Sequence, residues 1–179
     1  MEKVKFGLSN VHIAKRIEAE GGAVSYETPV EFPGAVNLTL EPQAEEINFY
    51  ADNVKYWNEF FLNSYSAEFE CAMVHDFFKT GYLGFMADTA GHLVETNARS
   101  NAFALMFQVE TDVSNKKYAI YNVIASKPNQ EYATVEESTE PQTSTLTLSI
   151  SGEKVGDVTA FITEVDSFSS LALPTFASI

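Results

Sequence analysis

The sequence predicts a mainly β protein: an antiparallel β-sandwich or partly closed barrel with one short α-helix. Most of the chain alternates apolar and polar residues with period two, as half-buried strands do. Only one segment has apolar residues at helical spacing. Hydrophobic residues make up 45 % of the 179 residues, enough for an ordinary core. The length is that of about one domain, which we expect to span residues 1–179.

Alternation is clearest in three segments, at 35–41, 64–73 and 143–151. The side chains expected to face inward are Val36, Leu38 and Leu40; Tyr65, Ala67, Phe69, Cys71 and Met73; and Leu146, Leu148 and Ile150. We expect further strands at 4–7, 11–17, 102–110, 118–126, 132–137 and 158–163. The strands 102–110 and 118–126 are apolar on both faces, which is typical of strands covered on two sides. Residues 112–117 between them are expected to form a hairpin loop.

The helical segment is 74–80, where Val74, Phe77 and Phe78 recur at helical spacing and Gly81 suits a C-terminal cap. A helix of two turns is marginal alone. We therefore expect it to bury Val74 with Phe77 or Phe78 against an open end of the sandwich.

Two segments do not fit a compact sandwich. Residues 42–63 carry six aromatic side chains between two strong strands, and a connection of that length is usually functional or disordered. Because aromatic residues argue against disorder, we expect a protruding arm that packs on another surface. Residues 167–179 are rich in Phe, Leu and Ala and carry no charge, so we expect a second, C-terminal arm.

Charge argues against several classes of partner. Eleven Lys and Arg against 25 Asp and Glu give a formal net charge of −14, which disfavours adhesion to nucleic acid and to anionic membranes. We find neither a signal peptide nor a run of about 18 apolar residues. We therefore expect the chain to be made in the cytoplasm and to make no membrane contact.

Catalytic and metal-binding patterns are missing from the sequence. His12, His75 and His92 do not form a ligand pair, and the alternation places Cys71 on an apolar strand face as a structural thiol. Residues 88–91 are expected to form a turn. We expect no cofactor, no metal and no enzymatic activity.

Six segments, in order along the chain, resemble one protein family. They are KVKFGLSNVHIA (3–14), the GGAVSYETPVEFPGAV block beginning at Gly21, FYADN (49–53), the helix with Asp76, Phe78, Lys79 and Gly84, YAIYNVIASKP (118–128) and EESTEPQTSTLTL (136–148). Together they resemble the major tail proteins of siphophages that infect Gram-positive bacteria. The matches cover most of residues 3–151, so expectations for the remaining C-terminal residues rest on composition.

The resemblance implies a tail tube subunit. Such subunits form hexameric rings that stack into a hollow conduit for DNA ejection, and the fold is shared with contractile tails and secretion needles. The implied partners are other copies of the chain, together with the tape measure, tail terminator and baseplate proteins, and DNA that passes without specific binding. The implied location is the virion tail, after synthesis in the host cytoplasm.

Two residue sets are expected to serve this role. A wall that DNA slides past should carry no cationic side chains, because these would bind its phosphates. The residues expected to face the lumen are therefore polar or acidic: Thr39, Glu41, Glu68, Glu70, Thr145 and Thr147. Residues expected at subunit contacts are Phe49, Tyr50, Tyr56, Trp57 and Phe176. The alternative function is a β-sandwich binding module that recognises carbohydrate or a receptor, with the aromatic arm as its platform.

Overall fold

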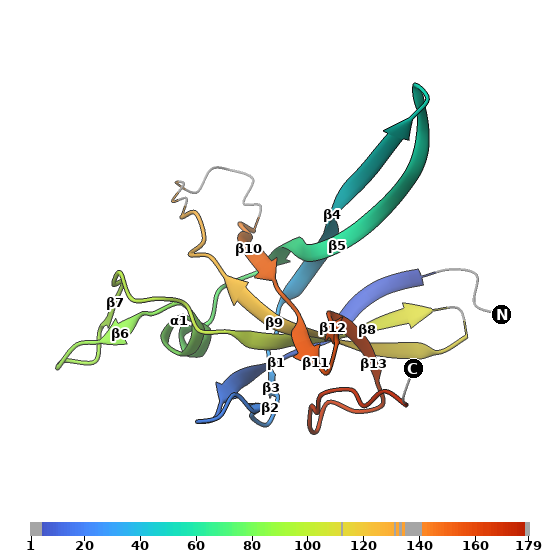
Figure 1. The fold of residues 1–179 in the computed structure, drawn as a ribbon. Helices are drawn as coiled ribbons and strands as arrows, with labels where there is room; N and C mark the ends of the chain where they lie inside the picture. The colour runs from blue at the N-terminus through green and yellow to red at the C-terminus, as the bar shows by residue number, and fades with distance from the viewer. Residues whose placement is uncertain (1–4, 112, 131, 133, 135–140, 178–179) are drawn as a thin grey trace.

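A computed structural model describes residues 5–111, 113–130, 132, 134 and 141–177 (Figure 1). It is mainly β, with antiparallel sheets and, in the part described, a single short helix, as the sequence predicted. The elements in chain order are β1 Lys5–Glu18, β2 Val24–Tyr26, β3 Val30–Glu31, β4 Ala35–Ala51, β5 Val54–Cys71, α1 Asp76–Tyr82, β6 Met86–Ala87, β7 Leu93–Val94, β8 Phe103–Thr111, β9 Asn115–Ala125, β10 Ser144–Ile150, β11 Glu153–Val155, β12 Val158–Ala160 and β13 Ile162–Val165.

Nine strands form one sheet in the order β2-β1-β8-β9-β10-β5-β4, with β3 beside β1 and β13 beside β9. Two separate hairpins, β6–β7 and β11–β12, flank it. The sheet curls until β4 comes close to β1. No hydrogen-bonded register joins those two strands in the described residues, so the fold is sandwich-like and not a closed barrel.

The main core lies inside the curl, between β1, β8 and β9 on one side and β4, β5 and β10 on the other. Leu146, Leu148 and Ile150 of β10 are buried there, as their alternation predicts. Strands β8 and β9 are buried on both faces along most of their length. That burial confirms the expectation of central strands at 102–110 and 118–126.

Helix α1 packs against the main core, as expected, although its limits differ from the prediction. Phe78 is 2 % exposed and meets Phe103 edge to face at 5.4 Å between ring centroids, whereas Phe77 is 39 % exposed. The helix ends two residues later than predicted, because the reversal falls at Gly84 and not at Gly81. Gly84 has φ +75°, and a Cβ there would lie 2.7 Å from the carbonyl oxygen of Ala98, so only glycine fits.

The outer face of β8 and β9 is covered by the chain's own C-terminal segment. Leu171 is buried against Ala104 and Met106, and the Tyr121 hydroxyl donates to the carbonyl oxygen of Ala172 at 2.8 Å. The described residues 167–177 therefore do not project as the arm that was expected. Their apolar side chains cover a sheet face that would otherwise be exposed to water.

Two side chains predicted to point inward do not. Val36 is 51 % exposed because a register shift between Ala35 and Asn37 makes it the extra residue of a β-bulge. Met73 is 60 % exposed because β5 ends at Cys71, two residues before it. Both predictions assumed an unbroken alternation.

Some predicted strand limits were also wrong. The two strands expected at 4–7 and 11–17 are one strand, β1, with a register shift between Ser9 and His12. The strand expected at 158–163 is divided into β12 and β13. Of the strand expected at 132–137, only Tyr132 and Thr134 are described, and neither lies in a strand; the rest of it, like residue 112 of the predicted hairpin loop, lies outside the described residues.

Candidate functional site: an aromatic arm and a polar sheet face

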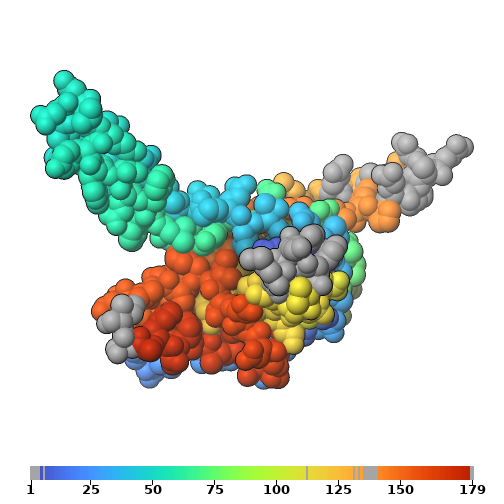
Figure 2. All heavy atoms as spheres, turned by 90° about the vertical axis from the view of Figure 1, so that its right-hand side faces the viewer, coloured from blue at the N-terminus to red at the C-terminus, as the bar shows by residue number. Residues whose placement is uncertain are grey.

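Residues 42–63 form the outer part of the β4–β5 hairpin. Its strands pair from Pro42 opposite Tyr65 to Ala51 opposite Val54. The connecting residues Asp52 and Asn53 have φ +52° and +61°, the conformation of a two-residue turn that matches the strand twist. The hairpin projects well beyond the curled sheet (Figure 1), and in Figure 2 it stands clear of the body. We call this segment the arm.

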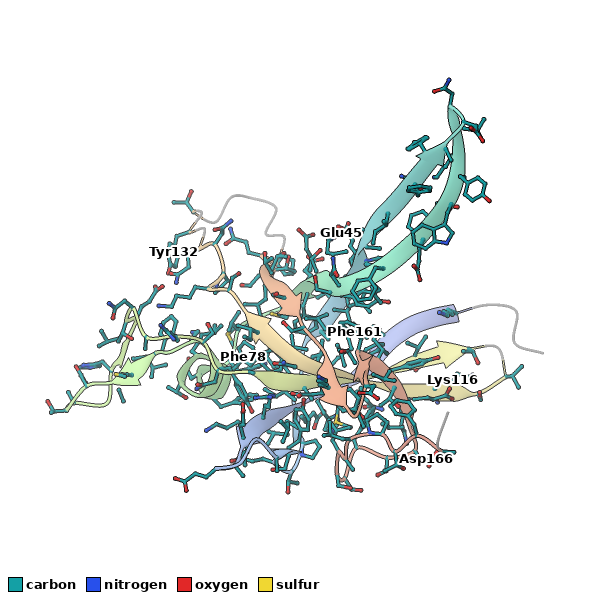
Figure 3. The ribbon with its side chains drawn as sticks, viewed as in Figure 1. Glu45, Phe78, Lys116, Tyr132, Phe161 and Asp166 are labelled. Atoms are coloured by element: carbon teal, nitrogen blue, oxygen red, sulfur yellow. The ribbon has the colours of Figure 1, made fainter. Side chains whose placement is uncertain are left out.

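The arm exposes an unusual amount of apolar surface. Its large apolar side chains with 47 to 73 % exposure are Ile47, Phe49, Tyr50, Val54, Tyr56, Trp57, Phe60 and Phe61. Figure 3 shows aromatic rings spread along both strands of the hairpin, away from the body. Large contiguous patches of exposed apolar side chains mark interaction surfaces. Four of the five predicted contact residues lie on this arm.

The two faces of the arm differ. Cross-strand pairing sets Phe49 opposite Trp57, and Phe49 also meets Tyr56 at 6.5 Å between ring centroids. Alternation places Ile47, Phe49, Trp57 and Phe61 on one face, together with Glu45 opposite Phe61 and Glu59 opposite Ile47. Tyr56 is the extra residue at the register shift between Phe49 and Tyr50, and its ring contact with Phe49 adds it to this side. We call Ile47, Phe49, Tyr56, Trp57 and Phe61 the apolar arm face.

The polar arm face lies opposite. Glu46 accepts a hydrogen bond from Lys55, which with Asn48 and Asn58 lowers the pKa of Glu46. Tyr50, Phe60 and Leu62 share this face. Its charged and amide groups bond to one another, while Tyr50 and Phe60 on the same face remain exposed.

The six residues expected to face a lumen come together on one sheet face. In the register of β4, β5 and β10, Glu70 lies between Asn37 and Thr145, and Glu68 lies between Thr39 and Thr147. The next row consists of Glu41, Ser66 and Ser149. All nine side chains are exposed or half-buried, and we call them the polar sheet face.

Three glutamates and no lysine or arginine stand in these rows. Hydrogen bonds hold the side chains within the face: Thr143 Oγ1 donates to Glu70 at 2.5 Å, and Gln43 Nε2 donates to Ser66 at 3.0 Å. Alternation could place each residue outward on its own strand. Only the tertiary register shows that the three strands are neighbours and that their polar residues form one surface.

Phe176, the fifth predicted contact residue, lies away from the arm's outer end. It lines a cleft of about 340 Å³ with Tyr65, Phe161, Ile162 and Pro174, and Thr159 also borders it. The rings of Tyr65 and Phe161 meet edge to face at 5.6 Å. We call this the basal cleft, because Tyr65 lies on β5 where the arm leaves the sheet.

Sequence reasoning missed a buried polar cluster. Glu153, 4 % exposed, accepts hydrogen bonds from Arg16 and from the Tyr26 hydroxyl, the latter at 3.2 Å. The Tyr26 oxygen in turn accepts the backbone N–H of Asn122 at 3.2 Å. Burial raises the pKa of Tyr26, and the hydrogen bond to Glu153 raises the pKa of Arg16. The cluster joins the neighbouring strands β1 and β2 to β9 and β11, which are far from them in the sequence, and no local motif predicts it.

The remaining reactive groups occupy structural positions. Cys71 is buried, its Sγ lies 3.6 Å from the carbonyl oxygen of Ser144, and burial raises its pKa to about 11. His92 lies 3.2 Å from Asp88, whose carboxylate also accepts backbone N–H groups in the turn predicted at 88–91. Among the described residues, no group of three His, Cys, Asp or Glu could hold a metal ion.

Comparison with protein-family models gives no match, and comparison with curated proteins gives none either. In the described part of the chain, no helix has the length and apolarity needed to cross a bilayer. The functional argument therefore rests on the sequence motifs and on the surfaces described above.

Proposed function

We propose that this chain is a structural subunit of a siphophage tail tube, which forms hexameric rings that stack into the conduit for DNA ejection. The observation that carries the proposal is the arm: a two-stranded hairpin that holds eight large apolar side chains in solvent. An isolated hairpin is marginally stable in water. A neighbouring subunit that covers these side chains would remove that apolar surface from water and hold the arm in place.

The polar sheet face supports the same function. A wall of hydroxyl groups and glutamates carries no cation that could replace the counterions of DNA. At physiological salt its repulsion extends about 8–10 Å into solution. A duplex can therefore slide past such a wall without binding to it, and we propose Glu68 and Glu70 as lumen residues.

The proposal carries consequences for partners and location. The chain is made in the host cytoplasm and ends in the virion tail, with other copies of itself, the tape measure, the tail terminator and the baseplate as its contacts. Neither a cofactor nor a catalytic step is needed, because the subunit works by assembling and by shaping a channel.

The competing function is a carbohydrate- or receptor-binding module, favoured by the exposed Trp57 and Tyr56 rings, since aromatic rings offer a flat apolar surface with a polar tip. The two functions differ in oligomeric state. Electron microscopy of the purified chain over a range of concentrations should show rings or tubes of uniform width. A chain that remains monomeric or trimeric at every concentration would instead favour the binding module.

A further inference from the structure

The arm joins the body at a short stretch of β4 and β5, where Pro42 lies opposite Tyr65. Proline fixes its own φ, and just beyond it the pairing is interrupted by the register shift between Gln43 and Ala44. The outer part of the arm stands clear of the body (Figures 1 and 2). The direction of the arm is therefore set by what its base contacts.

One aromatic side chain of the body lies against this base. The ring of Phe161 meets the ring of Tyr65 edge to face, and both side chains are half-buried and pack against the main core. Figure 3 labels Phe161 beneath the point where β5 leaves the sheet. Because edge-to-face ring pairs have a preferred geometry, Phe161 limits the movement of Tyr65 and, with it, the movement of the arm.

Two neighbours fix the position of Phe161. Its carbonyl oxygen accepts the backbone N–H of Tyr121 at 2.9 Å, which attaches it to the central strand β9. Gly152 lies beside its ring: a Cβ there would lie 2.9 Å from Phe161 Cδ1 and 2.8 Å from the carbonyl oxygen of Ala160. Gly152 also has φ +70°, so only glycine permits this close approach.

The buried polar cluster holds Gly152 in turn. Asn122 Nδ2 donates to the carbonyl oxygen of Gly152 at 3.0 Å, and the carbonyl oxygen of Asn122 accepts the backbone N–H of Ser151 at 3.2 Å. On the other side of Gly152, the carboxylate of Glu153 is held by its two buried donors. The backbone is thus fixed on both sides of the residue that lies against the Phe161 ring.

We propose that Glu153 and Phe161 are positioning residues that fix the direction of the arm. The cluster around Glu153 fixes Gly152, Gly152 and β9 fix Phe161, and Phe161 supports the base of the arm. The direction of the arm is a property of the single chain. Under the proposed function it also determines where the next copy lies, and hence how many copies close a ring. Only this consequence for the ring rests on the proposed function.

Spin-label distances measure the direction of the arm in the full chain, below the concentration at which copies assemble. Labels on Val54→Cys, beside the turn of the arm, and on Thr147→Cys of β10 report the distance from arm to body, and the native Cys71 is buried. We expect one narrow distance distribution. Phe161→Ala should about double its width, because the base of the arm loses its support. Phe161→Leu, which keeps apolar volume for folding but lacks the ring, should broaden it less.

Phe85 is the matched control for Phe161. It is another half-buried phenylalanine that packs against the main core, but it lies next to β6 and away from the base of the arm. Phe85→Ala should leave the width unchanged, and circular dichroism would verify that both variants are folded. Glu153→Gln should also broaden the distribution, whereas Glu18→Gln, which removes the exposed partner of Arg16, should not.

Equal widths for Phe161→Ala and Phe85→Ala, or for Glu153→Gln and Glu18→Gln, would overturn the positioning role while leaving the tube function standing. Electron microscopy of assembled Phe161→Ala should show rings with differing numbers of copies, where the wild-type chain gives one number. A wild-type chain that never assembles would overturn the proposed function, and the single-chain distances would still decide whether Phe161 and Glu153 position the arm.

Discussion

Arg16 and Glu153 lie 137 positions apart in the chain, and their ion pair joins β1 to β11 at the edge of the body. A second bond runs from the other end of the guanidinium, Nη2, to Glu153 Oε2 at 3.3 Å. The Tyr26 hydroxyl donates to the same carboxylate. A small peripheral hairpin is thereby attached to the main sheet by charge-assisted hydrogen bonds.

Glu153→Gln should destabilise the folded chain by about 3 kcal/mol, at the lower end of the range for a broken buried pair. The lower end applies because Arg16 keeps its bond to the exposed Glu18 at 2.9 Å. Chemical denaturation would measure the loss. Glu18→Gln is the control and should cost less than about 1 kcal/mol. Comparable losses in both variants would show that the buried position of Glu153 has no energetic consequence.

Phe78→Ala should lower the free energy of unfolding by about 3–5 kcal/mol, because it leaves a cavity beside Phe32 and Phe103. Phe77→Ala, on the exposed side of the same helix, should cost about 1 kcal/mol or less. Thermal unfolding of the two variants checks this difference. A stable Phe78→Ala protein would mean that α1 contributes little to closing the core.

Trp57→Ala should leave the single chain folded and block its polymerisation. The side chain is about half exposed on the arm and lies outside the main core, so its loss should change unfolding by no more than about 0.5 kcal/mol. Circular dichroism would report folding, and electron microscopy would report tubes. A variant that unfolds would place Trp57 in a supporting role within the chain and contradict the prediction.

Replacing Glu68 and Glu70 by lysine tests the lumen assignment. Tails of an infectious particle should still assemble, because neither glutamate belongs to the arm or lines the basal cleft. DNA delivery should slow in a salt-dependent way, since lysines release counterions when they bind phosphates. The paired glutamine variant controls for lost negative charge and should deliver DNA normally. Unimpaired delivery by the lysine variant would refute the assignment.

Stability should fall in alkaline solution. The folded thiol of Cys71 has its pKa raised to about 11 by burial, from a reference value of 9.0. Above pH 9 the unfolded chain loses this proton while the folded chain keeps it, so the free energy of unfolding decreases with pH by up to about 1.4 kcal/mol per unit. Urea unfolding at several pH values between 8 and 11 would measure the slope, which Cys71→Ala should reduce.

Alternation predicted the orientation of most strand residues but could not supply tertiary register. Thr39, Glu68 and Thr147 each point outward by local pattern, whereas their alignment in one row depends on which strands pair. The bulge at Val36 could not be predicted from the sequence, because a valine is compatible both with an inward-facing strand position and with a bulge.

The C-terminal segment was misjudged for a different reason. Its apolar composition suggested an arm, but the segment covers the chain's own sheet, where the surface that receives Leu171 is built from Ala14, Ala104 and Ala119, which come from three strands. Small side chains leave room for a covering segment only after those strands have paired, and composition does not show that arrangement.

The register shift between Gln43 and Ala44 lies where the arm leaves the body. A small rotation of the backbone at this point moves the far end of the arm by a much larger distance. From this bulge to the turn the strand spans about 30 Å at 3.3 Å per residue. That reach exceeds the ~16 Å radius of gyration of a compact chain of this length. A rotation of about 10° at the bulge, where ladder bonds are already interrupted, displaces the tip by about 5 Å. If copies assemble through their arms as proposed, many small rotations at these bulges would let the polymer bend while each apolar contact stays in place.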